Sequence, residues 1–74
     1  MKNKYNAGDN VIMIEEKTQA DFLSYRVSNE TIESVVLYKD KVDYYSESGD
    51  MEIPEKYLYT KEEAMEFLKG ALDG

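Results

Sequence analysis

The chain has 74 residues, a net charge of −7, and neither cysteine nor histidine. This length holds one domain with a modest core, and a hydrophobic content of 42% indicates a globular protein rather than a disordered segment. Without cysteine there are no disulfides or cysteine-ligated zinc, and without histidine the commonest general base and metal ligand are missing.

The first third of the chain predicts a polar end, a turn and two strands. Residues 1–7 are polar and we expect them to be flexible, whereas Gly8-Asp9-Asn10 predicts a turn. The short apolar run Val11–Ile14 is typical of a buried strand, which the polar residues 15–19 should end. From Phe22 to Val27, apolar and polar side chains alternate, and this period of two predicts a half-buried strand.

Two more strands are expected in the middle of the chain. Ser28-Asn29-Glu30 predicts a turn, and the run Thr31–Tyr38 is rich in β-branched and aromatic residues. Lys39-Asp40 separates this run from the strand expected at Val42–Tyr45, a spacing that suits a hairpin. Glu47-Ser48-Gly49-Asp50 is a clear turn signal.

A short strand and a helix are expected at the carboxyl end. Met51–Ile53 should form the strand, which ends at Pro54 because proline cannot donate to a ladder. Thr60 and Glu63 have the spacing of a capping box, so we predict a helix over residues 60–73. Its apolar stripe consists of Ala64, Phe67, Leu68, Ala71 and Leu72.

This order of elements predicts one mainly β domain over residues 1–74. Short connections favour antiparallel neighbours, and curling so small a sheet shortens its exposed edges. We therefore expect a five-stranded antiparallel barrel over residues 8–59, closed by one C-terminal α-helix. The alternative is an α+β arrangement, an open sheet with the helix on one face.

A resemblance supports the barrel. An ordered series of motifs runs over residues 8–72: Gly8-Asp9-x-Val11 opens the first strand, Ile53-Pro54-Glu55 follows, and Thr60-Lys61-Glu62-Glu63-Ala64 precedes Phe67-Leu68. This series resembles short SH3-like barrel proteins of low-GC Gram-positive bacteria and their phages. The resemblance implies an SH3-like barrel with a closing helix, and it supplies no catalytic residues. Residues 15–30 depart from the pattern and predict a longer first hairpin.

The negative charge is unevenly distributed along the chain. Residues 43–74 hold nine acidic side chains against three lysines, whereas residues 1–42 are almost balanced. Direct binding of nucleic acid needs a basic surface, so this imbalance argues against it. An acidic face steers toward basic partners instead, or it serves only to keep a small domain soluble.

The candidate partner-binding residues follow from this charge and from the tyrosines of the fourth strand. They are Asp43, Tyr44, Tyr45, Glu47, Asp50, Glu52, Glu55, Glu62 and Glu66. Because neighbours in a strand point to opposite faces, only one of the two tyrosines can serve as an outward aromatic anchor. The alternative is that both rings only pack within the domain.

Catalysis and metal binding have little support. Adjacent carboxylates such as Glu15-Glu16 and Glu62-Glu63 diverge rather than converge. Asp50 and Glu52 share a strand face, but a hard cation needs roughly six oxygen ligands in a shaped loop. The serines lack a base that could activate them. We therefore predict no enzyme activity, no catalytic residue, no cofactor and no metal.

The sequence thus predicts a non-enzymatic protein-binding module. We expect a phage or mobile-element accessory protein whose acidic surface inhibits or modulates a basic, nucleic-acid-handling host protein, as DNA-mimic inhibitors and some anti-CRISPR proteins do. The alternative is a small structural or regulatory adaptor that binds, or dimerises, through a sheet edge. With no apolar run long enough for a membrane and no signal peptide, the expected location is the bacterial host cytoplasm.

Overall fold

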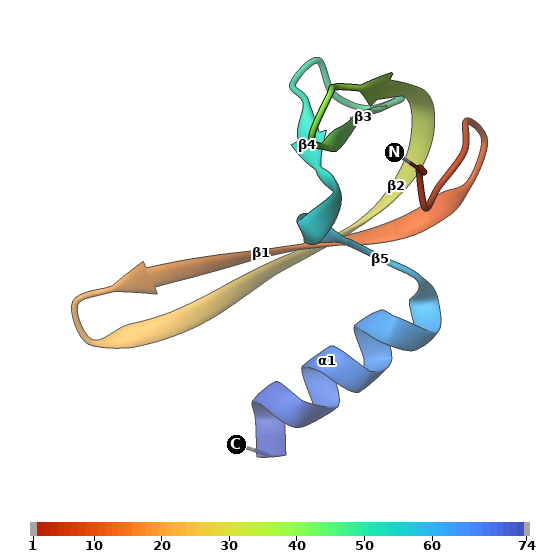
Figure 1. Ribbon diagram of the computed structural model, residues 1–74. Helices are drawn as coiled ribbons and strands as arrows, with labels where there is room; N and C mark the ends of the chain where they lie inside the picture. The colour runs from red at the N-terminus through yellow and green to blue at the C-terminus, as the bar shows by residue number, and fades with distance from the viewer. Residues whose placement is uncertain (1, 74) are drawn as a thin grey trace.

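Five antiparallel strands form one sheet, in the order β4-β3-β2-β1-β5, and a helix follows them (Figure 1). The computed structural model describes residues 2–73, and the side chains of residues 2–71. The elements are β1 (Asn10–Gln19), β2 (Phe22–Leu37), β3 (Val42–Ser46), β4 (Ile53–Pro54), the 3₁₀ turn η1 (Glu55–Tyr57), β5 (Leu58–Tyr59) and α1 (Lys61–Asp73). The predicted mainly β class with a C-terminal helix is confirmed.

The long strand β2 belongs to both halves of the sheet. Up to Thr31 it pairs with β1, and from Ile32 onward it pairs with β3. A bulge between Ile32 and Ser34 separates the two parts, and bulges bend a strand and increase its twist. One continuous strand thus replaces the two that were predicted on either side of residues 28–30.

The turn predicted at Ser28-Asn29-Glu30 is therefore wrong, and so is the end of the first strand at residues 15–19. Ser28 lies opposite Met13, and the β1–β2 ladder continues without a break to the pair Gln19↔Phe22. Ladder hydrogen bonds and cross-strand packing override the local turn preference of these polar residues.

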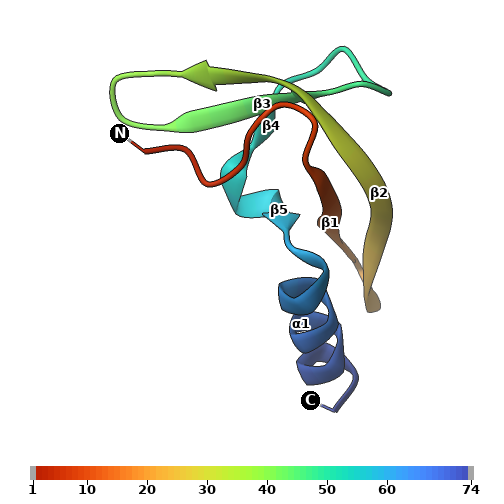
Figure 2. The same cartoon turned by 90° about the vertical axis from the view of Figure 1, so that its right-hand side faces the viewer.

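The sheet is not closed into the predicted barrel, and the open-sheet alternative matches it. Strands β4 and β5 lie at its two edges and pair over two residues each. Only the three residues of η1 connect them, and Pro54 lacks an N–H for a closing ladder. Figures 1 and 2 show the sheet strongly curled around β3, β4 and β5 but open between its edges.

The main core fills the curled half of the sheet and includes the amino-terminal segment. Its buried residues are Tyr5, Val11, Ile32, Val42, Tyr44 and Leu58. The Tyr5 hydroxyl donates to the carbonyl of Leu58 at 2.9 Å, and its ring meets Tyr44 edge-on at 5.6 Å between centroids. Apolar burial of Tyr5 therefore anchors the amino-terminal segment, predicted to be flexible over residues 1–7, to the sheet at this residue. Met1 lies outside the described residues.

The turn predicted before the first strand is confirmed. The Asp9 N–H donates to the Asn6 carbonyl at 3.0 Å, and Gly8 has a φ of +94°. Glycine suits this position because other residues are strained at positive φ.

The helix begins at the predicted capping box and covers one face of the sheet. The Thr60 N–H donates to Glu63 Oε1 at 2.9 Å, and the Glu63 N–H donates to Thr60 Oγ1 at 3.1 Å. Phe67 of the apolar stripe packs against Tyr25 and Tyr59, with centroids 5.4 Å apart in both pairs. Leu72 of the predicted stripe lies outside the described side chains. Within the described chain, no helix has the length and apolar character needed to cross a membrane.

The β1–β2 hairpin projects beyond the rest of the molecule (Figure 1). In β1, only Ile12 and Met13 pair with β5, and β2 pairs with β3 only from Ile32 onward. Residues 14–27 therefore form a two-stranded ribbon whose outer edges have no strand partner in the described chain. We call this ribbon the arm.

An acidic groove as candidate functional site

A groove of about 600 Å³ lies between the base of the arm, the β3–β4 loop and η1. Its apolar lining residues are Met13, Met51, Ile53, Pro54 and Tyr57. Its charged lining residues are Glu15, Glu16, Arg26, Glu30, Asp50 and Glu52. Strand alternation turns the Glu16 side chain away from Glu15. Four carboxylates and one guanidinium thus surround an apolar surface, and we call this site the acidic groove.

Strand register places Glu15 and Arg26 of the arm in the groove, whereas the side chain of Glu16 points to the other face. Glu15 lies directly opposite Arg26 in the β1–β2 ladder, and Met13 lies opposite Ser28. Because directly opposite residues share a face, these side chains point to the same side of the hairpin. The long hairpin therefore supplies one wall of the groove.

The β3–β4 loop forms the other wall, and two carboxylates hold it in place. Glu30 accepts hydrogen bonds from the hydroxyls of Ser46 and Ser48, the latter at 2.7 Å. These bonds lower the pKa of the Glu30 carboxyl. Glu52 accepts a hydrogen bond from the Tyr38 hydroxyl at 2.5 Å, which raises the pKa of Tyr38 to about 12. Glu30 and Glu52 thus shape the site.

Two other groove carboxylates are available to a ligand. Within residues 2–71, no hydrogen bond or salt bridge engages the side chains of Glu15 or Asp50. Beside them, Met51 has 78% of its surface exposed. No three acidic side chains of the described residues gather closely enough to hold a metal ion. The arrangement suits a spread of positive charges along a ligand.

The predicted acidic residues separate into two surfaces. Asp50 and Glu52 line the acidic groove. Glu47, at the start of the β3–β4 loop, is exposed but does not line it. Glu62 and Glu66 lie exposed on α1, also outside the groove.

The predicted tyrosine pair divides as strand geometry requires. Tyr44 points into the core and is completely buried, so it cannot be the outward anchor. Tyr45 points to the other face and is half-buried. If one ring of the pair contacts a partner, it is therefore Tyr45.

Two of the predicted acidic residues already have partners within the protein. Asp43 is 4% exposed and pairs with Lys41, with 3.5 Å between Oδ2 and Nζ. Glu55 Oε2 accepts the Tyr44 hydroxyl at 2.5 Å and the Lys4 backbone N–H at 3.2 Å. Glu55 therefore ties the amino-terminal segment to the core, and neither residue presents a free charge to a partner.

Sequence reasoning missed the contribution of the hairpin to the site. Glu15 and Glu30 come from the part of the chain that is nearly neutral overall, so a charge count along the sequence does not single them out. The signal lay in the long first hairpin, whose register brings them opposite the β3–β4 loop.

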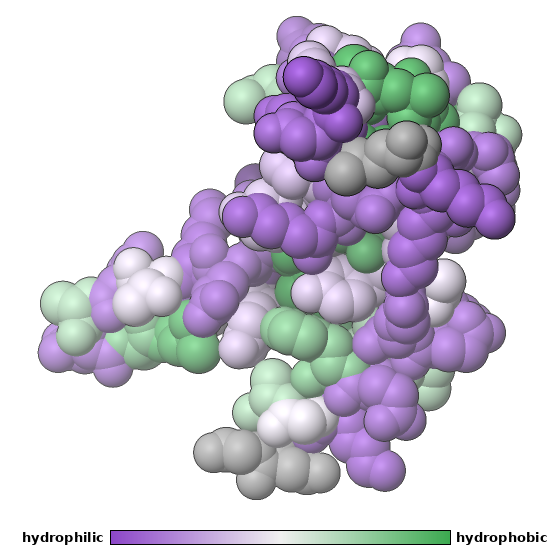
Figure 3. Space-filling model, in the orientation of Figure 1, coloured by the Kyte–Doolittle hydropathy of each residue, from purple (hydrophilic) through white to green (hydrophobic). Residues whose placement is uncertain are grey.

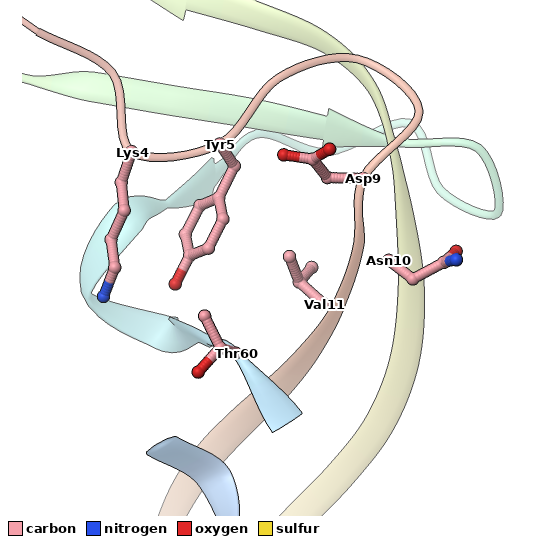
Figure 4. A pocket seen from close by; sticks show the side chains of 6 residues that line it. All are labelled: Lys4, Tyr5, Asp9, Asn10, Val11 and Thr60. Atoms are coloured by element: carbon pink, nitrogen blue, oxygen red, sulfur yellow. The ribbon is translucent and has the colours of Figure 1, made fainter. Parts of the chain in front are cut away.

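A second, smaller hollow of about 280 Å³ lies beside the amino-terminal segment (Figure 4). Tyr5, Val11 and Thr60 point into it, whereas Asn10 points away. The Tyr5 hydroxyl is already bonded to the protein, and Lys4 Nζ lies 2.7 Å from Glu63 Oε2. Because its polar groups are engaged internally, this hollow is a weaker candidate than the acidic groove.

Comparison of the chain with protein-family models, with curated proteins and with solved structures finds no match. The shape, charge and lining of the acidic groove therefore carry the functional inference.

Proposed function

We propose that the protein is a non-enzymatic binding module that holds a basic segment of a partner protein in the acidic groove. The observation that supports this is the four-to-one excess of carboxylates around a groove with an apolar lining. Charges at the rim of a concave site focus the potential and attract opposite charge. An apolar lining adds the contact area that a purely electrostatic surface lacks.

The groove favours a segment in which lysine or arginine residues are interspersed with apolar ones. Glu15 and Asp50 offer free carboxylates to the basic side chains. Met13 and Met51 offer flexible, polarisable contacts for apolar side chains of varied shape. The charge of the carboxylates would then provide specificity, and charge together with apolar contact would provide affinity.

Proteins that handle nucleic acid carry basic segments of this kind at their binding sites. We extend the proposal to a partner of that class in the host cytoplasm, and to an inhibitor or modulator that covers the partner's nucleic-acid contact. A phage or other mobile element is the source that would gain from such inhibition.

A labelled model peptide tests the proposal directly. The probe is a ten-residue peptide of alternating lysine and leucine, and its control carries glutamate in place of lysine. Fluorescence anisotropy should detect binding of the lysine peptide alone, and raising the salt concentration from about 0.05 to 0.3 M should weaken binding about tenfold or more. Equal binding of both peptides would overturn the proposal.

Matched charge variants locate the binding site. The double variant Glu15→Gln, Asp50→Asn removes two negative charges from the acidic groove, and Glu62→Gln, Glu66→Gln removes two from the exposed face of α1. We expect the first variant to weaken peptide binding about tenfold and the second by less than about twofold, because exposed distant charges are screened. Equal weakening would mean that only net charge matters.

A further inference from the structure

The outer edge of β2 in the arm carries unpaired backbone groups. The Ile32 N–H donates to the Asp9 carbonyl at 2.9 Å, and antiparallel hydrogen bonding alternates along a strand. Even-numbered residues of β2 therefore bond to β1, whereas Leu23, Tyr25 and Val27 direct their N–H and C=O groups away from it. No strand of the described chain pairs with this edge.

The same edge is apolar and accessible. Leu23 and Val27 are 48% and 46% exposed, and α1 meets this strand at Tyr25, whose ring lies edge-on to Phe67 with 5.4 Å between the centroids. Figure 3 shows apolar atoms along the projecting arm. An isolated two-stranded ribbon is only marginally stable in water, and a free edge of this kind is a template for another strand.

Charge and symmetry identify the strand that fits. Two copies related by a two-fold axis at Tyr25 would place Tyr25 opposite itself and Leu23 opposite Val27 of the other copy, so that apolar side chains meet across the axis. The outer edge of β1 offers no such match, because a two-fold axis at Glu16 or Lys17 sets like charges opposite each other.

We propose that the protein forms a homodimer by antiparallel pairing of β2 with β2 of a second copy, centred on Tyr25. Leu23, Tyr25 and Val27 each donate and accept a backbone hydrogen bond across the axis, and the two arms become one four-stranded sheet. Glu15 and Arg26 of the acidic groove point to the opposite face from Tyr25. Dimerisation is thus independent of the proposed ligand binding.

Amide hydrogen exchange followed by NMR tests this register on the wild-type chain. The amides of Ser24 and Arg26, which bond to β1, should be protected at any protein concentration. The amides of Leu23, Tyr25 and Val27 should become protected about tenfold or more as the concentration rises from micromolar to millimolar. Exchange of these three amides at one rate throughout would overturn the proposal.

Edge variants provide a second test by sedimentation. The wild-type chain has a mass of 8.6 kDa and should sediment at twice this mass at high concentration. Added salt should favour the dimer, because each copy carries a charge of −7 and salt screens the repulsion between copies. Val27→Pro removes an outward N–H of β2 and should abolish the dimer, whereas Thr18→Pro removes an outward N–H of β1 and should leave it intact. Loss of the dimer in both variants, or in neither, would contradict pairing through β2.

Discussion

The two parts of β2 lie in different surroundings although both are rich in strand-forming apolar residues. In the part that pairs with β3, Ile32 is fully buried beneath the curled sheet and the amino-terminal segment. In the arm, Leu23 and Val27 are about half exposed. The alternation of side chains along a strand therefore determines which of them share a face, whereas a second layer determines whether that face is buried.

The largest effect should come from truncating one side chain in each region. Tyr44→Ala removes a completely buried ring from the core and should lower the free energy of unfolding by about 3–5 kcal/mol. Leu23→Ala on the arm should change it by less than about 0.5 kcal/mol in dilute solution. Urea unfolding measures both values, and similar losses would show that the arm is packed more tightly than the structure indicates.

The hydrogen bonds of the Tyr44 hydroxyl also contribute to the stability of the core. The Tyr44 hydroxyl donates to Glu55 Oε2 and accepts the Tyr5 N–H at 3.2 Å. Tyr44→Phe leaves these groups without their partner and should destabilise the protein by about 1–3 kcal/mol. Tyr45→Phe, on the other face of the strand, is the control and should have almost no effect. If Tyr44→Phe left the free energy of unfolding unchanged, these hydrogen bonds would not hold the amino-terminal segment.

The helix cap should contribute somewhat less to the free energy of unfolding than the Tyr44 hydroxyl does. Thr60→Ala removes the oxygen that accepts the Glu63 N–H and should cost about 1 kcal/mol. Thr60→Ser keeps the hydroxyl and should remain close to wild type. Circular dichroism during urea unfolding distinguishes them, and equal stability of all three chains would exclude a stabilising capping box.

Glu30 and Glu63 should each make a small contribution to stability that is lost in acid. Hydrogen bonds from Ser46 and Ser48 lower the pKa of Glu30, and Lys4 lowers that of Glu63. A carboxyl with a lowered folded-state pKa contributes stability above its usual pKa, and this contribution is lost as the pH falls through the lower, folded-state value. Urea midpoints between pH 6 and pH 3 should therefore fall less steeply in Glu30→Gln than in wild type. An unchanged slope would contradict this role of Glu30.

Local signals predicted the elements whose ends are set by nearby residues. The capping box of Thr60 and Glu63 marked the start of α1, and Gly8 marked the turn before β1. In both cases the partners are within a few residues of each other, so spacing along the chain is enough to reveal them.

The remaining features depend on contacts between distant residues. The burial of Tyr5 requires Tyr44 and Leu58. The polar sequence around Tyr5 does not predict these distant contacts. The acidic groove combines Glu15 with Asp50, which come together only through the register of the long hairpin and the position of the β3–β4 loop. A charge count located the acidic half of the chain but not the concave surface that it helps to form.

An NMR titration shows whether a basic peptide binds in the acidic groove. The isotope-labelled chain is titrated with the alternating lysine–leucine peptide, and chemical-shift changes are mapped on the structure. Changes concentrated at Met13, Glu15, Asp50 and Met51, with α1 unaffected, are the result that we predict. Changes centred on Glu62 and Glu66, or spread evenly over the surface, would contradict a binding site in the acidic groove.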